Sequence, residues 1–306
     1  MKQRTIKPIL QILTLGGIFS VLVAGNCNKN DAPLPPIGGY NNSNEVAATN
    51  LKAHWSFDGT LNERISTTAS SASLRATFVT GKKGQAVKLD SGYILYPTIA
   101  ALNSNIGSFS VSTWIFTQNQ GTGSRPTGVF ALTLGAATTD WNDGPILLSL
   151  ENGRPVTYND TLVLKTNIAT TKAGVLLKGD NINDYGVRET DFKTVKGANQ
   201  WVHVVARWDG AGSFIDFYAN GIRVSNNNFR FREAAGIGFG NMTLPAGANT
   251  RVLFGGYPNT TNGFPLSALQ GFQGLFRGNI DETRFYNKAL TDSEINALYQ
   301  LELAGR

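Results

Sequence analysis

The alternation of hydrophobic and polar residues predicts a chain built mainly of β-strands. In residues 201–208, and again in residues 214–219, every second side chain is apolar, which is the period of a sheet with one buried face. Asp-Gly at 209–210 separates the two runs and Asn-Gly at 220–221 follows the second, and hairpin turns favour such pairs. We therefore expect a meander of antiparallel strands here.

One short helix is expected to close the chain. Thr291 and Glu294 stand three residues apart, as in a capping box, and apolar residues follow at helical spacing. Two antiparallel sheets packed face to face would bury the apolar sides of the strands. The remaining strand candidates are residues 51–57, 86–89, 92–96, 109–116, 129–134, 145–150, 174–177, 222–224, 251–254 and 272–285.

Three motifs in this region carry a family resemblance. They are W-x-H-V-V-x-x-x-D-G from Trp201, Y-x-N-G from Tyr218 and G-x-I-D-E-x-R-x-Y-N from Gly278. Together they resemble the LamG-like jelly roll of the concanavalin A-like lectin/glucanase superfamily, and the resemblance extends over residues 51–303. It implies an all-β fold, a two-sheet antiparallel jelly-roll sandwich with a short C-terminal helix. Function is left open, because this fold serves lectins, hydrolases and adhesion modules.

The N-terminus indicates secretion. Three basic residues precede an interrupted apolar run at 9–24, which predicts a signal peptide over residues 1–26 and is too short for a membrane span. Val-Ala-Gly-Asn-Cys at 23–27 resembles the lipobox of bacterial lipoproteins, although Asn26 departs from the small residue usual before the cut. We expect Cys27, the only cysteine, to receive lipid; the alternative is an incidental thiol.

The segment after Cys27 is rich in Asn, Pro, Gly and Asp and lacks periodicity, so residues 27–48 are interpreted as the lipidated cysteine and a flexible tether. Residues 49–306 then form one jelly-roll domain. The resemblance implies an outer-membrane lipoprotein of the cell envelope, of the Bacteroidetes type, with exposure at the cell surface as one orientation.

The formal charge of +6 is not evidence for a nucleic-acid partner. Three of the 27 basic residues and none of the 21 acidic ones lie in the signal peptide, which leaves +3 for the mature chain. We therefore expect no nucleic-acid partner.

Residues 117–200 supply the groups that a sugar site needs, an aromatic face and planar amides or carboxylates. In three places there, an aromatic residue stands beside Asn or Asp. The alternative is that these are Asx turns with the aromatic rings packed inward. The candidate ligand-binding residues are Trp141, Asn142, Asp143, Tyr158, Asn159, Asp160, Asp184 and Tyr185.

Catalytic chemistry is not indicated. A retaining glycosidase needs two carboxylates about 5 Å apart, whereas Asp281 and Glu282 are adjacent and would point to opposite faces of a strand. Calcium is a candidate cofactor, because the resemblance implies that acids such as Asp58 and Asp281 can hold it, although six to eight oxygens are needed. The alternative is that both acids bond backbone at strand ends.

We therefore expect a non-catalytic, lipid-anchored protein of the cell envelope that binds glycan. The alternative hypothesis is a protein–protein or adhesion module, and the third hypothesis is a divergent glycoside hydrolase.

Overall fold

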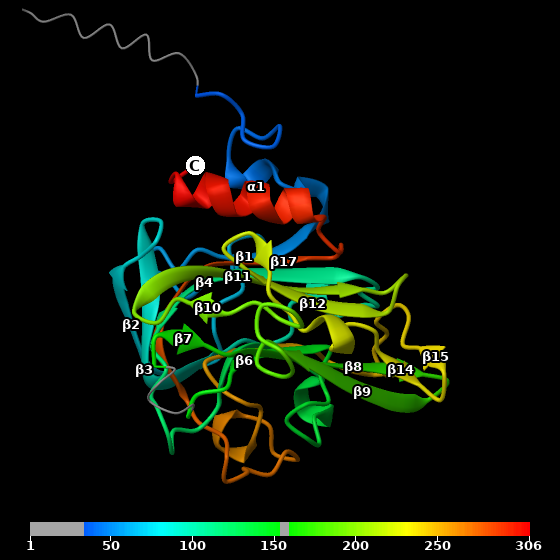
Figure 1. Cartoon of the computed structure of the whole chain (residues 1–306). Helices are drawn as coiled ribbons and strands as arrows, with labels where there is room; N and C mark the ends of the chain where they lie inside the picture. Colours follow the sequence, from blue (N-terminus) through cyan, green and yellow to red (C-terminus); the bar gives the residue numbers. More distant parts are fainter. Residues whose placement is uncertain (1–33, 154–158) are drawn as a thin grey trace, which may run out of the picture. The chain divides into compact units, whose positions relative to one another are not determined.

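The computed structural model describes residues 34–153 and 159–306, so the expected signal peptide, Cys27 and Tyr158 lie outside the described residues. Residues 35–306 form one compact unit (Figure 1). In the part of the chain that is described, no helix has the length and apolarity needed to cross a membrane.

The compact unit is almost entirely strand. All its named strand pairs are antiparallel, and one hydrogen-bonded path runs β13-β12-β11-β4-β17-β3-β16-β5-β6-β8-β9, with β1 on β17 and β2 on β3. The strands are β1 (Leu51–Trp55), β2 (Ala72–Thr80), β3 (Gln85–Leu95), β4 (Phe109–Thr117), β5 (Thr127–Thr133), β6 (Ile146–Leu150), β7 (Thr161–Leu162), β8 (Leu164–Lys172), β9 (Val175–Ile182), β10 (Val195–Lys196), β11 (Gln200–Asp209), β12 (Phe214–Ala219), β13 (Ile222–Arg223), β14 (Glu233–Ala234), β15 (Ile237–Gly238), β16 (Arg251–Phe254) and β17 (Phe276–Tyr286). The helix is α1 (Asp292–Leu303), and single 3-10 turns are η1 (Ser43–Glu45), η2 (Ala48–Asn50), η3 (Ala100–Leu102), η4 (Gly135–Ala137), η6 (Asn227–Phe229) and η7 (Thr260–Asn262).

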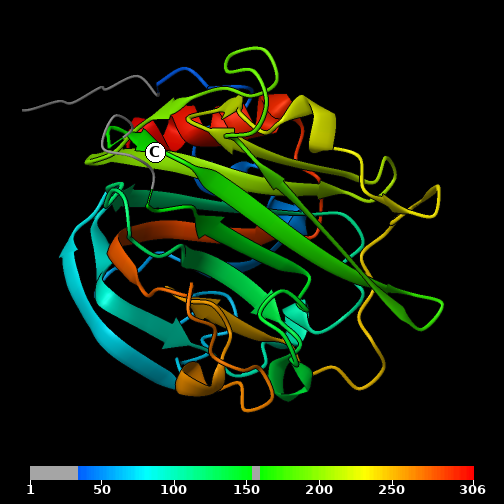
Figure 2. The ribbon, with the colours of Figure 1, turned by 60° about the horizontal axis from the view of Figure 1, so that its bottom comes forward.

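The long sheet curls on itself, so that its two halves face each other as layers (Figures 1 and 2). The first layer contains β4, β11 and β12, and the second contains β5, β6 and β8. Val204 and Ile215 of the first layer and Phe130 and Leu148 of the second belong to one buried hydrophobic cluster between them. The prediction of an all-β jelly-roll sandwich with a short C-terminal helix is therefore confirmed.

Helix α1 covers the outer face of the first layer. Its capping box is formed, because the Thr291 side chain accepts from the Glu294 amide and the Glu294 side chain accepts from the Thr291 amide. Ile295, Leu298 and Leu301 pack against the sheet in a second buried cluster.

The same cluster corrects the expected tether. Tyr40 and the fully buried Val46 pack there. The amide of Ser43 donates to the carbonyl of Arg306 at 3.2 Å. Residues 35–48 therefore belong to the folded unit, and only residues 27–34 can still be the tether, of which residues 27–33 lie outside the described residues.

A buried ionic network joins α1 to the sheet. Arg284 pairs with Glu282 at 2.5 Å and also with Glu302 of the helix. The indole N–H of Trp114 donates to Glu302 Oε2 at 2.6 Å. Burial opposes ionisation of Glu282, but a hydrogen bond from His54 and the charge of Arg284 lower its pKa to about 2. These groups hold the helix in place, and none of them lines the hollows described below.

Candidate functional site

Trp141 lies in the loop between β5 and β6, on the outer side of the second layer. Its ring meets Tyr257 and Phe272 edge-on, with centroids 5.4 and 5.5 Å away. Trp141 and Phe272 keep part of their surface exposed, whereas Tyr257 is buried. The loop therefore presents a small aromatic patch to solvent, supported by a buried ring.

Asp143 holds this loop in shape. It is 3% exposed, and its Oδ2 accepts from the amides of Thr139 and Asp140 at 2.9 and 2.7 Å. Its Oδ1 pairs with Lys178 Nζ at 2.6 Å. Burial opposes ionisation, but the hydrogen bonds from Lys178, Thr139 and the backbone outweigh it and lower the pKa of Asp143. Of the candidate ligand-binding residues, Asp143 therefore stabilises the loop, because both of its carboxylate oxygens already have partners within the protein.

A polar hollow lies beside the loop, over β8 and β9. It measures about 200 Å³ and is lined by Asn142, Asn167, Lys178, Gly179 and Asp180. Asn167 and Asp180 stand opposite each other in the β8–β9 register. Asn167 is only 6% exposed, and its Oδ1 has no hydrogen-bond partner among the described residues. An unpaired buried acceptor of this kind costs about 1–3 kcal/mol, so a ligand that donates to it is favoured.

Tyr185 marks a second hollow at the other side of Asp180. Its ring is 63% exposed and lies 5.2 Å from that of Phe229. Together with Asp180, Asn181 and Ile182 these rings line a space of about 190 Å³. The half-buried Asp184 lines neither hollow. Asp180 therefore borders two hollows, each with an aromatic side chain near it.

Asn159 and Asp160 form no part of this surface. Both are exposed and line neither hollow. Asp160 pairs with Lys196 at 2.7 Å, and the hydrogen bond from Lys196 lowers its pKa. This pair joins the ends of β7 and β10. The third residue of the predicted cluster, Tyr158, lies outside the described residues.

Asp58 and Asp281 hold one turn at residues 81–85. Asp281 Oδ2 accepts from the amides of Lys82 and Lys83 at 2.7 and 3.0 Å, and Asp58 Oδ1 accepts from that of Gln85 at 2.8 Å. Burial raises the pKa of Asp281 to about 7, against the opposing effect of the amides.

This donor set does not fit a calcium ion, because amide hydrogens point at the oxygens that a cation would need. Among the residues that the structure describes, no group of three or more His, Cys, Asp and Glu side chains could hold a metal.

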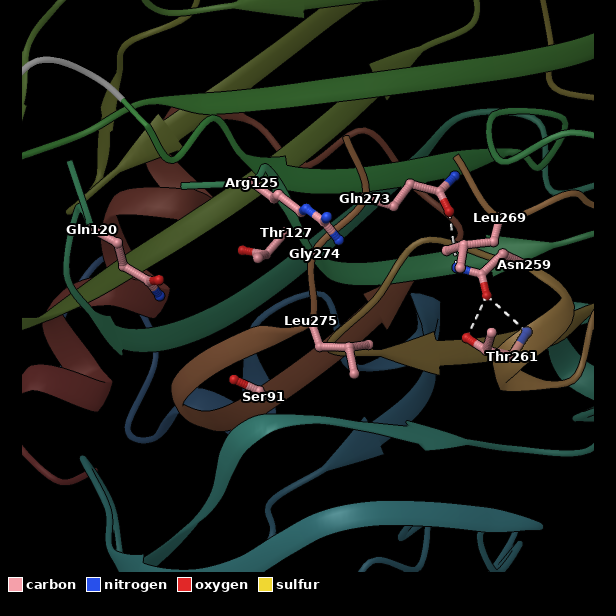
Figure 3. Close-up of a pocket in the computed structure, with 10 residues that line it drawn as sticks. All are labelled: Ser91, Gln120, Arg125, Thr127, Asn259, Thr261, Leu269, Gln273, Gly274 and Leu275. Carbon is pink, nitrogen blue, oxygen red and sulfur yellow. Dashed lines mark hydrogen bonds between the residues drawn. The ribbon is translucent and has the colours of Figure 1, made fainter. Parts of the chain in front are cut away.

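A further hollow, of about 450 Å³, lies between residues 120–127 and 259–275 (Figure 3). Arg125 and Gln120 line one side of it, and Asn259 and Gln273 line the other. Sequence reasoning missed this site, because its residues come from strands and loops far apart in the sequence and form no motif.

Comparisons with known proteins agree with this architecture. The family model Laminin_G_3, described as the concanavalin A-like lectin/glucanases superfamily, matches residues 88–296, more than half of the chain. A comparison with curated protein sequences gave no match.

Three solved structures illustrate the likeness of fold. The binding domain of botulinum neurotoxin serotype C1 is 12% identical, with a TM-score of 0.53 over 84% of this chain and 53% of that one. The binding domain of Paraclostridial Mosquitocidal Protein 1 is 16% identical, with a TM-score of 0.51 over 83% of this chain and 52% of that one. Domain 4 of AbnA, a GH43 extracellular arabinanase from Geobacillus stearothermophilus, solved with arabinotriose, is 21% identical over 82% of this chain and 98% of that one, with a TM-score of 0.47.

This chain thus spans about half the length of the two toxin binding domains. At these identities the likeness shows the fold alone. The strand order, the capped C-terminal helix and the family match together place the chain in the concanavalin A-like lectin/glucanase superfamily.

Proposed function

We propose that this protein is a non-catalytic glycan-binding module, attached to the cell envelope through lipid on Cys27. The observation that carries the binding proposal is the buried, unpaired Oδ1 of Asn167 in a hollow that is also lined by Asn142, the neighbour of the half-buried Trp141. The binding domain of botulinum neurotoxin DC, which is similar in fold, has been solved in complex with SialylT, which supports the same proposal.

The hollow offers the polar half of the chemistry that a neutral sugar needs, and the aromatic patch on the neighbouring loop offers the apolar half. A sugar hydroxyl can donate to Asn167 Oδ1 or to the carboxylate of Asp180, whereas the three donors of Lys178 already bond Asp143, Asn142 and Asp140. Trp141 and Phe272 supply apolar surface for the face of a pyranose ring. Asn142 Oδ1 accepts from Lys178 Nζ at 2.7 Å, which fixes the lysine at the edge of the hollow.

We propose that the protein is not catalytic because too few carboxylates line the hollows. Among the described residues that line the two hollows, Asp180 is the single acid, and Lys165 pairs with it at 3.2 Å. Glycoside hydrolysis requires two carboxyl groups on opposite sides of the scissile bond. A protein partner is the second candidate, since the binding domain of botulinum neurotoxin DC has been solved in complex with rat synaptotagmin II.

A glycan array probed with the whole chain tests the proposal. We expect binding to at least one neutral glycan, and loss of that binding in Trp141→Ala. Asn159→Ala is the matched control, because Asn159 is exposed and lines neither hollow. The proposal fails if no glycan binds, or if the Trp141 variant keeps the profile of the control.

Intact-mass measurement of the protein from the membrane fraction tests the anchor. We expect a chain that begins at an acylated Cys27. An uncleaved signal peptide or an unmodified cysteine would overturn this part of the proposal.

A further inference from the structure

The hollow between residues 120–127 and 259–275 differs in chemistry from the one beside Trp141. None of its ten lining residues is acidic, and Arg125 contributes a positive charge. Its volume of about 450 Å³ is within the range of small-molecule sites. No aromatic side chain lines it, so stacking of a sugar face is not its mode of recognition.

The orientation of Gln273 follows from a chain of hydrogen bonds. Asn259 Oδ1 accepts from the Thr261 amide at 2.9 Å and Asn259 Nδ2 donates to the Tyr257 carbonyl at 3.1 Å, which fixes the Asn259 amide group. Asn259 Nδ2 also donates to Gln273 Oε1 at 2.9 Å. The free end of the Gln273 amide is therefore Nε2. Gln273 is 4% exposed, and this nitrogen has no partner within the described ranges.

Arg125 supplies the second free donor. It is exposed, and its guanidinium makes no hydrogen bond or ion pair in the described part of the chain. Its side chain extends from the 120–127 side of the hollow toward the Gln273 side (Figure 3). The site thus combines a planar cation with a buried amide donor and holds no competing carboxylate.

We propose that this hollow is a second carbohydrate subsite, which binds the carboxylate of an acidic sugar such as a uronate. A guanidinium matches a carboxylate with two parallel hydrogen bonds, and Gln273 Nε2 donates to a third position on the same residue of the glycan. Gln120 and Thr127 are placed to bond sugar hydroxyls. The inference rests on the proposed glycan-binding function, but it uses separate residues.

Calorimetric titration of the whole chain with a uronate oligosaccharide, such as a galacturonate trimer, tests this. We expect Arg125→Gln to weaken binding at least tenfold, because glutamine is neutral and its amide can keep at most one of the two parallel hydrogen bonds to the carboxylate. Higher salt is expected to weaken the wild-type complex. Arg277→Gln is the matched control, since Arg277 is also exposed but lines a different hollow. The control should bind like the wild type.

Two further ligands test which chemical class of ligand the hollow binds. The same oligomer with its carboxyls reduced to alcohols should bind about tenfold more weakly than the uronate, and an acidic peptide of equal charge should not compete. Equal affinity for the reduced oligomer, competition by the peptide, or an unaffected Arg125 variant would overturn the inference. Neutral-glycan binding through Asn167 would survive any of these outcomes, so the two proposals can fail separately.

Discussion

Replacing Asp143 with alanine is expected to release the loop that carries Trp141. The carboxylate accepts two backbone amides, from Thr139 and Asp140, and pairs with Lys178. Hydrogen bonds to a charged group contribute about 1.5–3 kcal/mol each, but they are not additive. The side chain of Lys178 is 33% exposed and can turn to solvent, so the ion pair adds little. We expect a loss of about 2–3 kcal/mol in the free energy of unfolding.

Urea unfolding at neutral pH measures this loss, and the same variant should bind neutral glycan more weakly because the Trp141 ring is no longer held. The pKa of Asp143 is lowered from 3.8 in the folded protein. Its stabilisation is therefore present above pH 3.8 and is lost as the pH falls through the lowered value. The wild type and Asp143→Ala should converge in stability in acid. A variant within 0.5 kcal/mol of the wild type at neutral pH would refute the reasoning.

Four other predictions concern the scaffold. Glu302→Ala should cost about 1–3 kcal/mol in urea unfolding, because it removes one of the two carboxylates paired with the buried Arg284 and the acceptor of the Trp114 indole N–H, whereas Asn296→Ala on the exposed face of the same helix should cost less than about 0.5 kcal/mol. Gly84→Ala should lower Tm, since Gly84 has φ +63° and a Cβ there would lie 2.1 Å from the Asp58 carboxylate; an unchanged Tm would contradict the turn geometry. Burial raises the pKa of Asp281 to about 7, so its contribution to stability is present below pH about 4 and is lost as the pH rises through 7, and Asp281→Asn should remove this part of the pH profile. A chelator should leave Tm unchanged, because the carboxylates of Asp58 and Asp281 accept from backbone amides of the turn, whereas a fall in Tm would support the calcium prediction.

The strands with strong alternation could be predicted from the sequence. Residues 201–208 and 214–219 form β11 and β12, and the Thr291 cap begins α1. The inclusion of residues 35–48 in the folded unit could not be predicted, because a segment rich in Asn, Pro and Gly has the composition of a linker. It is ordered only because Val46 and its neighbours find an apolar surface under α1.

The candidate site was predicted in part. The cluster at 141–143 lies at a hollow, but Asp143 turns inward, since a ligand-binding carboxylate and a turn-forming one look the same in sequence. Asn167 was not predicted as a site residue, because the pattern of apolar and polar residues over 164–172 does not clearly indicate a strand. Its position opposite Asp180 follows from register, which only tertiary structure fixes.

The measurement that tests the glycan-binding surface most directly is the affinity of Asn167→Leu for the neutral glycan that the wild type binds. Leucine is close in shape and removes the unpaired acceptor, so stability should be equal to or greater than that of the wild type. We predict loss of binding at least tenfold with an unchanged or raised Tm. Unchanged affinity in a folded variant would contradict the account.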